Sequence, residues 1–267
     1  MGAGNVRVPR QRPGAIRIAF ALLLTMLMLY LLTLNSPNDA ASAPSFDASG
    51  GERATVEIEF ASLEGHFVQL CLCKTQQDAR IEAARYIPRG GAGYLLEDAG
   101  WHVLGAGYET LAAAQRSAQR LSDAEGLDCR AYSLRAEGVL LRMTGTQGEI
   151  SALRDADSLL RALFSQMNQA AAGLDNGSAS FEQTQTLLAV LQNKAEQAAL
   201  ALQSMGGWQE NPVSAGMEAL MRNAADALGA LCTEKTASTL SFSAQIKYNS
   251  IDLRAAHVRF LRELTKS

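Results

Sequence analysis

Residues that could carry out acid–base, metal or nucleophilic chemistry are few in this sequence and far apart. The histidines are His66, His102 and His257, and no His-x-x-His, Glu-x-x-His or Cys-x-x-Cys spacing, the usual signature of zinc ligands, occurs. A Gly-x-Ser-x-Gly motif is missing, and the triplet Gly105-Ala106-Gly107 lacks the third glycine of a nucleotide-binding loop. His257 falls on the apolar seam of a predicted helix, where a packing role is expected. We therefore expect no enzymatic activity, no metal and no cofactor.

Charge narrows the range of partners. The formal net charge is −3, and acids and bases are mixed along the chain. Nucleic-acid binding usually needs a basic stripe. The basic cluster of this chain stands at its N-terminus, directly before an apolar segment, so nucleic acid is not an expected partner.

A strand–helix–strand unit occurs twice in the first half of the chain. The first copy comprises a strand at 67–73, a helix at 74–85 and a strand at 93–96; the second comprises 102–108, 109–121 and 128–134. Val68, Leu70 and Leu72 alternate with more polar residues, which is the period of a strand. The fold class we predict is therefore α+β, with a ferredoxin-like βαββαβ sheet in the order 4-1-3-2. Both helices would cover one side of this sheet and leave the other side as an open groove.

These residues carry a resemblance to a known family. The run FVQLCLCKTQQDA (67–79) is similar to the Tyr-Val-Gln-x-Gly-Ser-Phe opening of sporulation-related repeat (SPOR) domains. The run WHVLGAGYETLAAAQ (101–115) resembles the Tyr-x-Val-x-x-Gly-x-Tyr signature of their second half, and GGAGYLLED (90–98) also fits. The resemblance implies an extracytoplasmic module that binds peptidoglycan glycan strands freed of their stem peptides, at division or sporulation septa.

The resemblance also implies site residues. Gln69 stands where the family has a glycan contact, whereas Cys71 and Leu72 replace the family's Gly-Ser pair. Trp101 and His102 occupy the place of an aromatic and a basic residue in the third strand, but as neighbours only one of them can face the groove. Sugar recognition needs an apolar platform and polar groups for hydroxyls, so the candidate glycan-binding residues are Gln69, Tyr94, Trp101 and His102.

The N-terminal segment predicts the compartment. Residues 18–34 form an uncharged apolar run of about 17 residues, the short end of what spans a bilayer. Arginines precede it, namely Arg7, Arg10, Arg12 and Arg17. This positive-inside pattern predicts a cytoplasmic tail at 1–17, a single transmembrane helix at 18–34 and extracytoplasmic residues beyond it. A cleaved signal peptide ending at Ala41-Ser42-Ala43 is the alternative, although Pro44 would hinder cleavage. Residues 35–54 have the composition of a flexible linker.

Helical periodicity dominates the second half of the chain. We divide the rest into a SPOR-like domain at 55–142 and an antiparallel helical bundle at 148–267. Ser180 and Gln183 form a capping-box pattern, and Pro212 suits the first turn of a further helix. The sequence leaves open whether the bundle has three or four helices. The apolar residues of these helices have a spacing like that of a coiled coil. They leave open whether the bundle is self-contained, forms a homo-oligomer or binds a helical protein partner.

The cysteines leave two states open. Cys71 and Cys73 point to one face of the first strand, and the strand order expected from the repeat brings Cys129 beside them, which permits a disulfide. Cys232 would remain single in the bundle. The alternative is that all four are buried thiols that act as small apolar residues.

Two hypotheses of function remain. The first is a membrane-anchored, non-enzymatic protein that binds denuded glycan strands in the cell envelope during sporulation or cell division. The second is an envelope interaction or scaffold factor in which the SPOR-like sheet has lost glycan binding and the helices mediate assembly.

Overall fold

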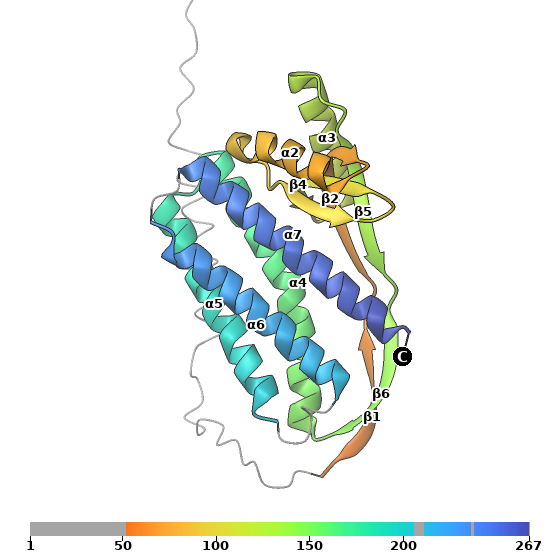
Figure 1. Cartoon of the computed structure of the whole chain (residues 1–267). Coiled ribbons are helices and arrows are strands. Elements are labelled where there is room, and N and C mark those ends of the chain that lie inside the picture. Colours follow the sequence, from red (N-terminus) through yellow and green to blue (C-terminus); the bar gives the residue numbers. More distant parts are fainter. Residues whose placement is uncertain (1–51, 206–210, 236–237, 267) are drawn as a thin grey trace, which may run out of the picture. The chain divides into compact units, whose positions relative to one another are not determined.

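The computed structural model describes residues 52–205, 211–235 and 238–266, which belong to one compact unit, Ala48–Ser267 (Figure 1). The order of elements is β1 (Ala54–Phe60), β2 (Leu63–Cys73), α2 (Gln76–Tyr86), the 3-10 turn η1 (Ile87–Arg89), β3 (Tyr94–Glu97), β4 (Trp101–Tyr108), α3 (Leu111–Glu125), β5 (Arg130–Ala136), β6 (Val139–Gly145), α4 (Gln147–Asp175), α5 (Phe181–Gln203), α6 (Pro212–Thr233) and α7 (Thr239–Leu264). The described chain is thus α+β, with six α-helices and two antiparallel sheets.

The larger sheet contains the doubled strand–helix unit. Its strand order is β3-β4-β2-β5, and every neighbouring pair is antiparallel, so the predicted order of these four strands is confirmed. Ala79 of α2 and Ala118 of α3 pack with Val68, Leu70 and Val103 on one face, which we call the α2–α3 face. Alanine suits these positions because it lets a helix approach the strands closely.

Two compensating bulges interrupt the pairing of the two central strands. Val68 pairs with Ala106 and Gln69 with Leu104, so Gly105 is an extra residue in β4; Cys71 then pairs with Val103, so Leu70 is an extra residue in β2. A Cβ atom on Gly105 would lie 2.9 Å from the Leu70 side chain, which explains the glycine.

A second, two-stranded sheet extends the first and was not predicted. β1 pairs with β6 from Ala54–Gly145 to Phe60–Val139. The chain bends between β1 and β2 and again between β5 and β6, so that two long bent strands lie side by side (Figure 1). Gly138 stands at the second bend, where a Cβ atom would lie 3.0 Å from the Ser62 amide nitrogen. Only glycine permits such a close approach of two backbones.

The helical half has four helices, which answers the question that the sequence left open. α4 follows β6 directly: Thr146 caps it, and Glu149 completes a capping box. The predicted capping box of Ser180 and Gln183 at the start of α5 is confirmed, as is Pro212 in the first turn of α6. α6 ends at Thr233, and α7 begins separately at Thr239.

The predicted open groove is wrong, because helices cover that face of the larger sheet. α7 runs across it and α4 lies beside α7 (Figure 1). Phe67 of β2 meets Phe164 of α4 edge to face with ring centres 6.4 Å apart, and Leu104 of β4 is fully buried. We call this face the α7 face.

The composition of α7 explains the covering. Besides the predicted seam, which includes Ile246 and Leu253, α7 carries a second buried stripe with Ile251, Ala255 and Val258 at 1% exposure or less. A helix that is apolar on two sides must be covered on two sides. One side of α7 therefore packs on helices, while residues such as Tyr248 and Asp252 meet the sheet.

The predicted fold class is corrected accordingly. The structure has two sheets and a helical half packed against the larger one, not a single open sheet followed by a separate bundle. The transmembrane helix predicted at 18–34 lies outside the described residues. Among 52–205, 211–235 and 238–266, no helix is both long enough and apolar enough to cross a membrane.

Candidate functional site

The four candidate residues do not converge on one surface. Gln69, Tyr94 and His102 lie on the α7 face, as their contacts and cross-strand partners show. Trp101 lies on the α2–α3 face, packed at the edge of the cluster that holds Val103. Neighbouring residues of a strand point to opposite faces, so Trp101 and His102 are separated by the sheet itself.

Tyr94 is used for packing between β3 and α7. It is 6% exposed, its hydroxyl donates to Asp252 Oδ1 at 2.9 Å, and its ring meets that of Tyr248 at 5.2 Å. Burial, followed by the charge of Asp252 and the hydrogen bond to it, raises the pKa of Tyr94 above its usual range. The phenol therefore stays protonated and bonded to α7, which leaves it no free group for a sugar.

Gln69 and His102 form one polar unit where the sheet extends past α7. His102 Nδ1 lies 2.7 Å from Gln69 Oε1, and His102 Nε2 lies 2.7 Å from the Asp98 carbonyl oxygen. A neutral imidazole has a single N–H, so when Nε2 donates to Asp98, Nδ1 is an acceptor and needs a donor. The Gln69 amide supplies one when its NH₂ group is turned to the ring. Its carbonyl oxygen is then left to accept a hydrogen bond from outside.

Tyr132 and Asp98 complete this unit, and sequence reasoning missed both. The Tyr132 ring lies 4.4 Å from the His102 ring, and its hydroxyl donates to Asp98 Oδ2. Burial, the hydrogen bond to Asp98 and its charge raise the pKa of Tyr132, which keeps the phenol a donor. The available signal was that Arg130, Tyr132 and Leu134, each two residues apart, share one face of a predicted strand. Nothing in the local sequence places that strand next to Gln69.

Two exposed side chains frame the unit. Leu72 is the cross-strand partner of His102 and is 57% exposed. Arg130 is the partner of Gln69; its side chain is 71% exposed and bonded to Asp128, also exposed, at 3.0 Å. We define the sheet-end patch by its six residues: Gln69, Leu72, Asp98, His102, Arg130 and Tyr132.

Trp101 instead stands near three cysteines. Cys73 is its cross-strand partner, Cys71 Sγ lies 3.7 Å from Cys73 Sγ, and Cys129 is buried in the same apolar cluster. All four cysteines are free thiols. Burial is the main cause that raises the pKa of Cys71 to about 12, with Cys73 adding to it, so this thiol is not a nucleophile at neutral pH.

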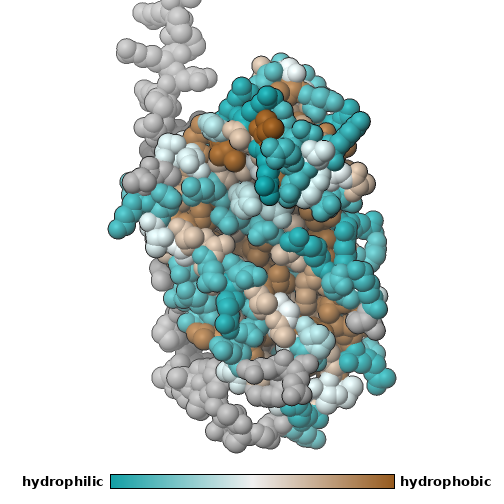
Figure 2. Space-filling view, viewed as in Figure 1, coloured by the Kyte–Doolittle hydropathy of each residue, from teal (hydrophilic) through white to brown (hydrophobic). Residues whose placement is uncertain are grey.

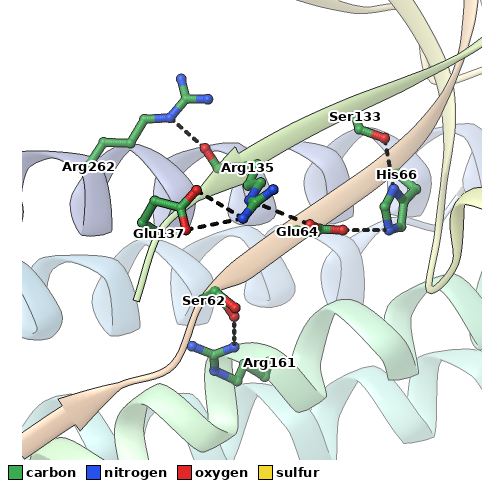
Figure 3. A network of polar contacts seen from close by, with 8 residues as sticks. All are labelled: Ser62, Glu64, His66, Ser133, Arg135, Glu137, Arg161 and Arg262. Atoms are coloured by element: carbon green, nitrogen blue, oxygen red, sulfur yellow. Dashed lines mark hydrogen bonds and ion pairs between the residues drawn. The ribbon is translucent and has the colours of Figure 1, made fainter. Parts of the chain in front are cut away.

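A second polar network lies at the bend between the two sheets (Figure 3). His66 Nδ1 lies 2.9 Å from Ser133 Oγ, and His66 Nε2 lies 3.4 Å from Glu64. The order serine, histidine, carboxylate is that of a nucleophile with its base. Glu64, however, is shared with Arg135 at 3.6 Å, and Ser133 is exposed on an edge strand. Such a site neither excludes water nor encloses an acyl group.

The same network joins the strands to the helices. Arg161 of α4 donates to the carbonyl oxygens of Ala61 and Ser62 at 2.7 and 3.1 Å, and Arg262 of α7 donates to the carbonyl oxygen of Arg135 at 2.7 Å. These bonds satisfy backbone groups at the bend, where strand pairing is interrupted. The network is therefore a structural link.

Metal chemistry gains no support from the geometry. Within the part of the chain that the structure describes, no three His, Cys, Asp or Glu side chains come together as a set able to hold an ion. The sheet-end patch consequently stands as the candidate site, with chemistry limited to hydrogen bonds, charge and ring contacts.

Comparison of the chain with protein-family models, with curated proteins and with solved structures found no match. The resemblance to SPOR domains stays a prediction that rests on the short motifs alone.

Proposed function

We propose that this protein is a non-enzymatic glycan-binding protein of the cell envelope and that the sheet-end patch is its binding site. The observation that carries the proposal is the composition of the patch. It joins the exposed side chains of Leu72, Asp98 and Arg130 with the partly exposed Gln69 amide and Tyr132 ring, and the buried His102 imidazole holds Gln69 in place from below. Sugars have apolar ring faces and hydroxyl rims, so this combination suits them.

Each group has a role in that proposal. Leu72 and the edge of Tyr132 offer the apolar surface, while Gln69 and Asp98 offer oxygens that accept from hydroxyls. Arg130 is held by an exposed ion pair with Asp128, which contributes little and opens easily. Its guanidinium can then pair with a carboxylate, the group that a muramic acid residue gains when its stem peptide is removed.

The predicted N-terminal anchor adds the location. A transmembrane helix at 18–34 with a cytoplasmic tail would hold the patch outside the membrane, beside the wall. We propose that the protein acts there during sporulation or cell division, as the resemblance implies.

A second candidate is an envelope interaction factor that no longer binds glycan. It is favoured by the covering of the α7 face, since α7 leaves only the end of the sheet exposed. Leu200 of α5 is 55% exposed and lines a hollow between α5 and α6 together with Glu196, Arg222 and Asp226. An apolar side chain among mixed charges suits a second helix, from another copy or from a partner protein.

Retention on cell wall tests the first candidate. The purified full chain is mixed with intact wall and with wall stripped of stem peptides by an amidase, and the retained fraction is measured. We expect retention on stripped wall, weakened about fivefold or more by Gln69→Ala or by Arg130→Gln, because each loses a direct hydrogen bond.

Arg135→Gln is the matched control. Arg135 lies on the same strand as Arg130 with a similarly exposed side chain, but on the α2–α3 face. It should leave retention unchanged. Equal retention of the unaltered chain on both walls would remove the first candidate, and equal losses from Arg130→Gln and Arg135→Gln would show a general charge effect.

A further inference from the structure

A hollow of about 240 Å³ opens on the α2–α3 face, on the side of the sheet away from the sheet-end patch. Its floor is formed by the central strands, and its walls by the end of α2 with η1 and by α3. Asp175 at the end of α4 and Lys247 of α7 close one end. The helices α2, α3, α4 and α7 and the turn η1 thus contribute to one site.

The hollow exists because the two helices cover different strands. α2 packs mainly on β4, β2 and β3, whereas α3 packs on β2, β5 and β4, so the space above the strand centre lies between them. Gly91, Gly105 and Ala106 line that space and carry almost no side chain to fill it. The bulge at Gly105 is part of the same feature.

The interior combines apolar side chains with hydroxyl groups, among them those of Tyr108 and Ser117, which bond to each other at 2.6 Å. Val68, Leu70, Leu121 and Leu127 line it. Tyr86 also lines it, is 9% exposed, and its hydroxyl has no hydrogen-bond partner among the described residues. In the described residues the buried side-chain atoms without a partner are Asn168 Nδ2 and Arg254 Nε, so the Tyr86 hydroxyl is open to solvent and can donate to a ligand that enters the hollow.

Two ion pairs stand at the rim and differ in strength. Arg89 and Glu125 lie 3.4 Å apart across the mouth, with side chains 61% and 40% exposed. Such an exposed pair shifts an equilibrium by about fivefold at most, so a ligand can replace it. Lys247, with a side chain 13% exposed, is held by Asp175 at 2.7 Å and by the Gly90 carbonyl oxygen at 2.7 Å, and Ser243 also donates to Asp175. Lys247 and Asp175 therefore stay paired with each other and form one side of the hollow.

We propose that the hollow binds a free zwitterionic amino acid with a bulky apolar side chain. The side chain enters the apolar interior, the carboxylate pairs with Arg89 and accepts from the Tyr86 hydroxyl, and the ammonium pairs with Glu125. Two cations and two anions at the rim favour neither a simple anion nor a simple cation. A ligand that carries both charges can replace the exposed pair of Arg89 and Glu125. The volume of the hollow suits one large side chain.

Titration with three small molecules tests the chemistry. The full chain in lipid nanodiscs is titrated calorimetrically with L-phenylalanine, with N-acetyl-phenylalanine amide, which lacks both charges, and with glycine, which lacks the side chain. For a ligand of this size we expect a Kd of about 0.1–1 mM for phenylalanine. The uncharged amide should bind roughly tenfold more weakly or worse, and glycine should give no heat of binding.

Three variants test the location. Ala106→Leu fills the floor and should abolish binding, while Arg89→Gln and Glu125→Gln should each weaken it about fivefold or more. The matched control is Arg85→Gln, since Arg85 forms an exposed pair with Glu82 on α2 but does not line the hollow. Circular dichroism melts establish that each variant is folded.

The outcomes are distinct. No heat with phenylalanine up to 10 mM, set about tenfold above the weakest expected Kd, would overturn the proposal, as would unchanged binding by a folded Ala106→Leu chain. Because the sheet-end patch is on the opposite face, Ala106→Leu should leave retention on stripped wall unchanged. The inference therefore does not depend on the proposed glycan binding.

Discussion

Gly65 in β2 is a residue whose lack of a side chain decides how closely α7 approaches the sheet. A Cβ atom there would lie 2.6 Å from Phe67 Cζ and 2.7 Å from Arg254 Cγ. Arg254 is 5% exposed and its guanidinium lies 4.0 Å from the centre of the Phe164 ring, so it has little room to move. We expect Gly65→Ala to lower the free energy of unfolding by about 2 kcal/mol, measured by urea denaturation.

Gly148 supplies the control for this prediction. It lies in the first turn of α4, and the nearest atom to an added Cβ is Thr146 Oγ1 at 4.0 Å. Gly148→Ala should raise the free energy of unfolding by about 0.5–1 kcal/mol, because alanine favours the helix. A comparable loss in both variants would contradict the close approach at Gly65.

Single residues also show how far the sequence could predict the site. Strand alternation predicts that Trp101 and His102 lie on opposite faces of the sheet, and the structure agrees. The strand order predicts that the strands of Gln69 and His102 are neighbours, and their side chains are in contact. Tyr132 and Asp98 could not be found in this way, because their contact depends on the exact register and on a turn with Ala99 at φ 51°. The packing of Tyr94 on α7 could not be predicted either, since its partner, Asp252, belongs to a distant helix.

The contact of α4 with α7 contains an ionisable pair that should make stability depend on pH. His257 is 1% exposed and lies 2.9 Å from Asp157 Oδ1, while Arg161 also bonds to Asp157 at 2.8 Å. Burial lowers the pKa of His257 despite its hydrogen bond to Asp157; Arg161 and Arg254 face the same ring and act in the same direction as burial. Burial alone would raise the pKa of Asp157, but bonds from His257 and Arg161 outweigh it and lower the pKa.

The direction of the effect follows from these shifts. Both groups hold a proton less tightly in the folded chain, so the unfolded chain takes up more protons as the pH falls. Their contribution is complete above the unfolded pKa values, about 6.5 for histidine and about 3.9 for aspartate. It is lost as the pH falls through the lower folded values. We expect stability to decrease from pH 7 towards pH 4.

His257→Gln tests this pair. The variant should lose about 1–3 kcal/mol at pH 7 through the weakened buried hydrogen bond. It should also show a flatter decrease in stability between pH 7 and pH 5 than the unaltered chain, in urea denaturation at each pH. Parallel curves for the two proteins would mean that His257 does not titrate with unfolding.

At the scale of elements, the sequence predicted the helices better than the sheets. The 3.6-residue period, the capping box that begins at Ser180 and the proline at Pro212 are local signals, and they located α5 and α6 well. β1 and β6 have a period of two, but they are separated by the whole larger sheet, so neither segment reveals its partner. The sequence did not predict that α7 covers the α7 face. A second apolar stripe on a helix indicates that this side is buried, but it does not identify the element that packs against it.

Most of the described chain shares one continuous core, while α2 and α3 pack on the other face of the larger sheet in a second, smaller cluster. Buried residues from β1, the α7 face of the larger sheet and all of α4 to α7 belong to a single cluster. Figure 2 shows polar residues over most of one face of the molecule, with apolar residues between them. The division into 55–142 and 148–267 stays a prediction about separate folding, and this shared core favours joint unfolding of the two parts.

A buried leucine far from the sheet can test whether unfolding is cooperative. Leu191 of α5 is 1% exposed, and Leu191→Ala should cost about 2–5 kcal/mol. In a Trp208→Phe background, Trp101 fluorescence reports on β4, while far-ultraviolet circular dichroism reports mainly on the helices. We expect both signals to shift to the same lower urea midpoint, because loss of packing in α5 weakens the core that also holds the sheet. If the Trp101 signal kept its original midpoint while the helical signal moved, the sheet would fold without the helices, and the covered α7 face would be able to open.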